Sequence, residues 1–76
     1  MSSRDELIER GNKLADQYTE SELKAALKNA IFMDDNEERL SIQWALKQKT
    51  GTTDGYAFTK EQQADTEKRL ELEPTA

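Results

Sequence analysis

The most constraining feature of this sequence is a helix-start motif that recurs four times along 76 residues. In each copy a Ser, Thr or Asp is followed three positions later by Glu or Gln, which is the pattern of a capping box. The two side chains of such a box satisfy backbone amides that the start of a helix leaves without partners. Four helix starts in so short a chain predict an all-α fold. The motifs are Ser3–Glu6, Thr19–Glu22, Asp35–Glu38 and Thr59–Gln62.

Composition points the same way. The chain has no Val and only three Ile, whereas Glu, Lys, Gln, Leu and Ala, which favour helix over strand, are frequent. Leu, Ile, Val and Phe supply 13 of 76 residues, and less than about one fifth is typical of disordered chains. The interspersed charges and the periodic apolar positions favour a folded chain instead. At this length we expect a single small helical domain over residues 1–76.

The first predicted helix contains a glycine on its apolar stripe. Gly11 lies four residues after Leu7 and three before Leu14, so it shares their helix face. Glycine inside a helix costs about 1 kcal/mol relative to alanine. We therefore predict that another helix crosses closely at Gly11, and the alternative is a helix end at Gly11–Asn12. The apolar positions of this segment are Leu7, Ile8, Leu14, Ala15 and Tyr18.

Two further helices are predicted over residues 20–33 and 36–49. The first of these has apolar residues at i, i+3, i+4, i+7 and i+8 from Leu23, a regular amphipathic stripe. Asp34 and Asp35 would oppose the dipole at a helix C-terminus but favour an N-terminus, so we predict a break there, with Asp35 as the next cap. The broad apolar arc of helix 36–49 predicts that this helix is the central element of the fold. We expect Gly51 to end it in a left-handed conformation.

The last predicted helix, within residues 59–73, is polar nearly all round. Its apolar residues are Ala64, Leu70 and Leu72, and they form no stripe. Such a helix either crosses solvent between other elements, frays, or becomes stable only when a partner binds. We therefore expect a three-helix core plus a polar fourth helix. Residues 1–58 would form the packed body and its connecting loop, in which 56–58 is a short extended piece, and residues 74–76 would form a tail.

The residue types present exclude several kinds of chemistry. The chain has no Cys and no His, so it lacks disulfides, thiolate metal sites and an imidazole base. Its serines have no histidine to activate them, and capping explains the carboxylate pair Asp34 and Asp35. The loop from Thr50 to Glu61 has the length of an EF-hand loop, but threonines stand where calcium-binding carboxylates belong. We expect no catalytic residue, no cofactor and no metal.

No segment has the character of a membrane span or a secretory signal. The longest apolar run is the four residues 30–33, far short of the roughly 20 needed to cross a bilayer. The first six residues, Met-Ser-Ser-Arg-Asp-Glu, lack the apolar core of a signal peptide. We therefore expect a cytoplasmic protein.

Helices 20–33 and 36–49 have the proportions of a DNA-binding helix-turn-helix. Arginine and glutamine, which are good readers of base edges, lie on one face of helix 36–49. Against this hypothesis, the N-terminal part of that helix is acidic, and the net charge of the chain is −5, which phosphates would repel. The candidate DNA contacts are Arg39, Gln43, Lys47 and Lys49.

By elimination, the favoured hypothesis is a small non-catalytic regulatory or accessory module that binds another protein, with inhibition as one mode of action. Large side chains would anchor the partner, and carboxylates of the last helix would meet a basic surface, although Trp44 is expected to belong to the core. The alternatives are DNA binding and a structural subunit of a larger assembly, such as a viral particle; self-association stays open. The candidate partner contacts are Phe32, Met33, Trp44, Tyr56, Glu61, Asp65 and Glu67.

Overall fold

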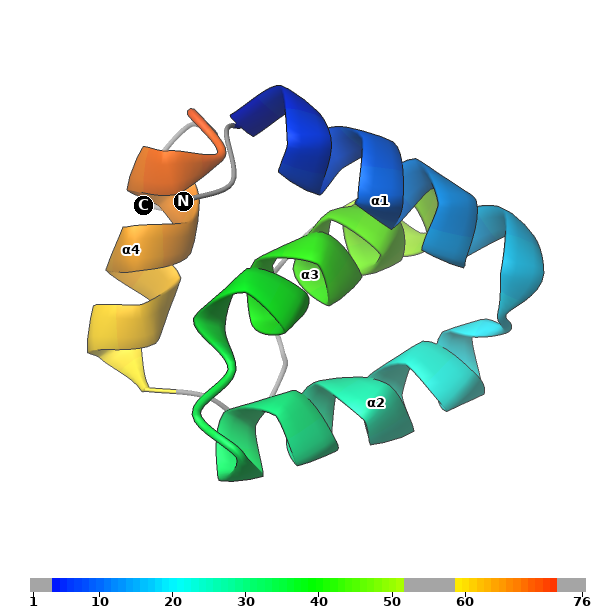
Figure 1. The fold of residues 1–76 in the computed structure, drawn as a ribbon, viewed down its shortest axis with the longest axis horizontal. Coiled ribbons are helices and arrows are strands. Elements are labelled where there is room, and N and C mark those ends of the chain that lie inside the picture. The colour runs from blue at the N-terminus through cyan, green and yellow to red at the C-terminus, as the bar shows by residue number, and fades with distance from the viewer. Residues whose placement is uncertain (1–3, 52–58, 73–76) are drawn as a thin grey trace.

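The computed structural model describes residues 4–51 and 59–72, and their regular structure is entirely α-helical (Figure 1). This confirms the predicted all-α fold with four helices. Residues 1–3, 52–58 and 73–76 lie outside the described ranges, and with them the extended piece predicted at 56–58. The helices are α1 (Arg4–Gln17), α2 (Glu20–Phe32), α3 (Asn36–Thr50) and α4 (Lys60–Arg69).

Two of the predicted capping boxes are complete. At the start of α2, the Glu22 amide donates to the Thr19 hydroxyl at 3.2 Å, and the Thr19 amide donates to the Glu22 carboxylate at 2.9 Å. Thr59 and Gln62 make the same reciprocal pair at the start of α4, at 3.1 and 3.2 Å. In this chain, therefore, both Glu and Gln complete the box from the position three residues after the N-cap. Ser3, the first residue of the box at α1, lies outside the described ranges.

The box predicted at α3 is only half formed. The Glu38 amide donates to the Asp35 carboxylate at 3.2 Å, so Asp35 is the N-cap as expected. The Glu38 carboxylate does not return to the Asp35 amide but pairs with Arg10 of α1. The Glu38 side chain, which was expected to cap α3, thus forms an ion pair that links α3 to α1.

Left-handed residues end three of the helices. Gly51 ends α3 at φ 84°, as predicted. Asp34, at φ 56°, follows α2, and Glu71, at φ 54°, follows α4. In both places the amide of the next residue donates to the carbonyl five residues earlier, which is the Schellman arrangement. Because of this turn α4 ends at Arg69, before the end of the predicted range 59–73.

Helix α3 is the central element, as predicted. It packs against both α1 and α2, whereas α1 and α2 make few contacts with each other (Figure 1). Its side chains are buried over most of the helix circumference because neighbours cover it from several directions. The main apolar cluster between α2 and α3 consists of Leu23, Leu27, Ala30, Ile42, Ala45 and Leu46.

Helix α1 runs unbroken through Gly11, which confirms a close crossing and excludes a helix end there. A β-carbon built on Gly11 would lie 2.6 Å from Cδ1 of Trp44 and 2.8 Å from the backbone oxygen of Ser41. These distances are shorter than van der Waals contact. Any larger residue at this position would therefore push α1 away from α3.

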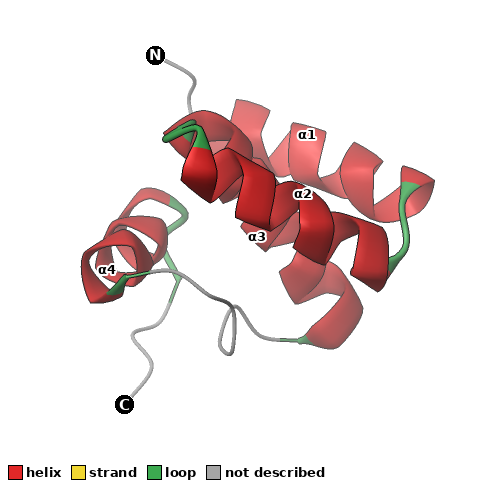
Figure 2. Cartoon of the chain, turned by 90° about the horizontal axis from the view of Figure 1, so that it is seen from below, coloured by secondary structure: helices red, strands yellow, loops and turns green. Residues whose placement is uncertain are grey.

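Helix α4 lies to one side of the other three helices (Figure 2) and makes fewer contacts with them. Directly after it, Leu70 is fully buried in a second apolar cluster with Leu7 and Leu40. Arg4 of α1 donates to the Leu70 carbonyl at 2.9 Å and pairs with Glu71. The expectation that this segment lacks core contacts is wrong at Leu70, because it lies four residues after the buried Thr66 and continues that face of α4 into the core. Across the described ranges, no helix combines the length and apolarity needed to cross a bilayer.

Candidate functional site

The most exposed large apolar side chain among the described residues is Phe32, at the end of α2. It is 86% exposed, and its neighbour Met33 is 66% exposed. Each residue turns about 100° around a helix axis, so Phe32, two positions beyond the buried Ala30, faces nearly the opposite side. The same geometry that buries the stripe of α2 therefore presents Phe32 to solvent. Both residues were predicted partner contacts, and the structure places them side by side at the surface.

Two hollows lie along α2, and together they form what we call the α2 groove. Their volumes are about 270 and 310 Å³. Ala26, Glu38 and Ile42 line both hollows, so the two adjoin each other, with Tyr18 in the lining of the first and Met33 in the lining of the second. The remaining lining residues are Leu14, Glu22 and Leu23 in the first hollow, and Asn29, Ala30 and Asp35 in the second.

The α2 groove combines an apolar floor with an acidic rim. Leu23 and Ile42 are each 1% exposed and form the floor. Three of the described lining residues are carboxylates (Glu22, Asp35 and Glu38), and none is basic. The capping hydrogen bonds of Glu22 and Asp35 do not neutralise their charge, and only Glu38 has an ion-pair partner, Arg10. The groove therefore carries net negative charge.

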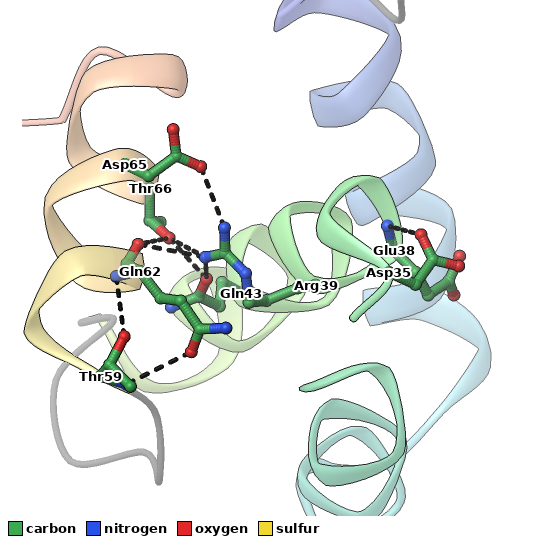
Figure 3. A network of polar contacts seen from close by, with 8 residues as sticks. All are labelled: Asp35, Glu38, Arg39, Gln43, Thr59, Gln62, Asp65 and Thr66. Carbon is green, nitrogen blue, oxygen red and sulfur yellow. Dashed lines mark hydrogen bonds and ion pairs between the residues drawn. The ribbon is translucent and has the colours of Figure 1, made fainter. Parts of the chain in front are cut away.

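A second notable feature is a polar network that joins α3 to α4 (Figure 3). Its centre is Arg39, which is 1% exposed. The Arg39 guanidinium donates to Asp65 at 3.0 Å, to the Gln62 carbonyl at 3.1 Å and to the Thr66 hydroxyl. It also donates to Gln43, at 2.9 Å, within α3. Helix α4 thus docks on α3 mainly through hydrogen bonds and one ion pair.

The network is not fully satisfied. Nε of Arg39 and Nε2 of Gln43 are buried and have no hydrogen-bond partner among the described residues. Burial lowers the pKa of the Arg39 guanidinium, and the hydrogen bond and charge of Asp65 oppose that shift. An arginine stays protonated throughout the physiological range, so the buried positive charge depends on Asp65 as its anionic partner.

This network changes the interpretation of the candidate DNA contacts. Arg39 and Gln43 share a helix face as predicted, but α4 covers that face, and neither side chain is accessible to a DNA groove. Lys47 lies over the ring of Trp44, with its Nζ 5.6 Å from the ring centroid, and Lys49 is exposed. The four residues therefore do not form one accessible surface in this fold.

The other candidate partner contacts separate into different environments. Trp44 is half-buried against Gly11, and its indole N–H donates to Asn12 at 2.9 Å, so it mainly serves the α1–α3 crossing. Asp65 is engaged by Arg39. Glu61 is exposed on α4 and Glu67 is half-buried. Tyr56 lies outside the described residues.

Sequence reasoning missed the groove itself. Tyr18 was placed on the apolar stripe of the first helix, but α1 ends at Gln17, and Tyr18 is 44% exposed at the end of the groove. Ala26 was assigned to the buried stripe of α2 and is instead exposed on the groove wall.

A third hollow, between the N-terminal ends of α3 and α4, has a volume of about 410 Å³ and a polar lining. Arg39 and Arg69 face three carboxylates there, so charges of both signs are already mixed, and the site favours neither an anion nor a cation. Within residues 4–51 and 59–72, no cluster of three or more carboxylates is placed to hold a metal ion.

Comparisons with protein-family models, curated proteins and solved structures give no significant match to this chain.

Proposed function

We propose that this chain is a small non-catalytic module that binds a partner protein through Phe32, Met33 and the adjoining α2 groove. The observation that carries the proposal is the 86% exposure of Phe32 in a chain with only two phenylalanines. Phenylalanine is usually buried in folded proteins. Covering such a side chain contributes about 1.5–3 kcal/mol, which makes Phe32 and Met33 suitable interface anchors.

The form of the module supports a regulatory role. Helices α1–α3 hold the surface through packed apolar clusters, so it is preformed and loses little conformational freedom on binding. A module without catalytic activity acts on its partner by binding to it. Inhibition of that partner is one form of such regulation.

The experiment that tests this proposal compares affinity capture from an extract of the natural source by three immobilised proteins. These are the wild type, the double variant Phe32→Ser/Met33→Ser and a control, Lys24→Ser/Lys28→Ser, altered on other exposed positions of α2. We expect one or a few proteins to be retained by the wild type and the control and lost by the first variant. Both variants should keep the helical circular dichroism of the wild type, because the altered side chains are exposed.

Retention of the same proteins by Phe32→Ser/Met33→Ser would contradict the proposed surface. Equal loss by the lysine control would mean that binding depends on α2 in general, and not on the exposed apolar pair.

The DNA-binding alternative leads to a different prediction. With Arg39 and Gln43 covered by α4, only Lys47 and Lys49 of the four candidate contacts have any access to a phosphate. We therefore expect only non-specific binding, with a Kd of about 1 μM or weaker at physiological salt. A mobility-shift assay with mixed DNA, repeated with Lys47→Gln/Lys49→Gln, measures this. Sequence-selective, submicromolar binding by the wild type would refute the protein-binding proposal in favour of DNA.

A further inference from the structure

We infer that the α2 groove binds an amphipathic helix of a partner protein, with an apolar stripe and flanking Lys and Arg side chains. This inference rests on the proposed function, because it specifies the partner segment that lies beside Phe32 and Met33. Shape, lining and charge each contribute to it separately.

The walls of the groove favour a helical occupant. The groove runs along α2, whose 13 residues span about 20 Å, the length of three to four helical turns. Its walls come from helices, whose backbone groups are already paired within each helix. An extended peptide would find no free backbone edge to pair with there, as it would on a sheet. A helix satisfies its own backbone groups and needs only side-chain contacts.

The lining defines the apolar stripe of the occupant. Ala26, at the middle of the groove, is small and exposed, which lets another helix axis approach closely. Tyr18 and Met33 are partly exposed apolar side chains at the two ends. A helix whose apolar stripe continues through i, i+3 or i+4, i+7, i+11 and i+14 spans about 20 Å and would contact these three positions along one face.

The charge of the groove defines the flanks of the occupant. Glu22, Asp35 and Glu38 line the groove without a basic neighbour in the lining, and the chain has a net charge of −5. Basic side chains on either side of an apolar stripe would complement this rim and accelerate association. A second copy of the chain is disfavoured by the same argument, since it brings a further net charge of −5 to an acidic groove.

The test is a selection with a phage-displayed library of 16-residue helical peptides, randomised at all surface positions, against the immobilised wild-type protein. We expect the selected peptides to share an apolar stripe at i, i+3 or i+4, and i+7, and to be enriched in Lys and Arg. Synthetic copies should bind with an affinity that falls as salt is raised. Amide chemical-shift changes should concentrate on Tyr18, Ala26 and Met33.

Two matched pairs of variants locate the binding. Ala26→Trp fills the groove and should weaken the selected peptides by roughly tenfold or more, whereas Ala25→Trp, exposed on the same helix but outside the groove lining, should stay within about twofold. Glu22→Gln removes a rim charge yet keeps the capping box, as Gln62 does at α4. It should weaken binding by roughly two- to fivefold, and Glu20→Gln, outside the groove, should not.

The inference is overturned if no peptide is enriched, if the selected peptides lack the stripe or the basic residues, or if Ala26→Trp binds as well as Ala25→Trp. It is also overturned if size-exclusion chromatography shows self-association that Ala26→Trp abolishes, since the occupant would then be a second copy. If Ala26→Trp folds poorly, Glu22→Gln still decides the role of the rim charge. A partner lost by Phe32→Ser/Met33→Ser but kept by Ala26→Trp would contradict the groove, while protein binding through Phe32 and Met33 would still stand.

Discussion

Replacing Gly11 by leucine is expected to destabilise the protein by about 3 kcal/mol, at the upper end of the usual cost of overpacking. Even the β-carbon would lie 2.8 Å from the Ser41 backbone oxygen and 2.9 Å from Cβ of Trp44. Neither atom is the end of a flexible side chain, so α1 would have to shift relative to α3. Urea unfolding followed by circular dichroism measures the change.

Gly11→Ala separates the crowding from helix propensity. Alanine gains about 1 kcal/mol over glycine within a helix, but the same β-carbon contacts remain, so we expect a net loss of about 1 kcal/mol. Ala25→Leu, on the exposed surface of α2, is the control and should change stability by less than about 0.5 kcal/mol. A neutral Gly11→Leu would refute the close crossing of α1 and α3.

Asp65→Ala is expected to cost about 3 kcal/mol, because it leaves the buried Arg39 charge without an anionic partner. The Arg39 side chain is 2% exposed, whereas that of Asp65 is 43% exposed. Water can reach the Asp65 carboxylate but not the Arg39 guanidinium. Removing Asp65 therefore leaves a charge that water cannot solvate, and this costs more than removing Arg39, which leaves a carboxylate that water can solvate. Urea unfolding gives the free energy, and hydrogen exchange should show α4 losing protection before α1–α3.

A double variant makes this prediction specific. Arg39→Met removes the buried charge, so Arg39→Met/Asp65→Ala should be more stable than Asp65→Ala alone. Lys68→Ala, exposed on the same helix as Asp65, should change stability by less than about 0.5 kcal/mol. A double variant that is less stable than Asp65→Ala would show that Arg39 stabilises α4 by packing and not through its charge pair.

Local rules were enough to place the helices and one crossing. The boxes at Thr19 and Thr59, the cap at Asp35 and the terminator at Gly51 each depend on a few neighbouring residues, and the structure confirms all four. Gly11 was identifiable because glycine on an apolar helix face is costly unless something packs against it.

The docking of α4 could not be predicted from apolar periodicity. The side of α4 that meets α3 carries the half-buried Gln62 and the buried Thr66, and the buried Leu70 directly after the helix continues the i, i+4 and i+8 spacing, so two of these three are polar. This side of α4 can be identified as an interface only from the tertiary structure, in which Arg39 of α3 projects towards it. The left-handed conformations of Asp34 and Glu71 could not be predicted either, because a left-handed residue after a helix is usually glycine.

The candidate surface was predictable in its anchors but not in its shape. Phe32 and Met33 stood out as large side chains beyond the stripe of α2. The groove beside them depends on how α1, α2 and α3 splay around Ile42, which is a tertiary property. Arg39 and Gln43, chosen for their shared helix face, proved to be buried by a helix that local rules could not position.

The most direct test of the central claim, that Phe32 lies at a protein interface, is site-specific photo-cross-linking in the natural source. A photoreactive amino acid replaces Phe32 in one experiment and Lys68, exposed on α4 and outside the groove lining, in the control. We predict a discrete cross-linked protein from position 32 that is absent from position 68. No adduct from position 32, or the same adducts from both positions, would contradict the claim.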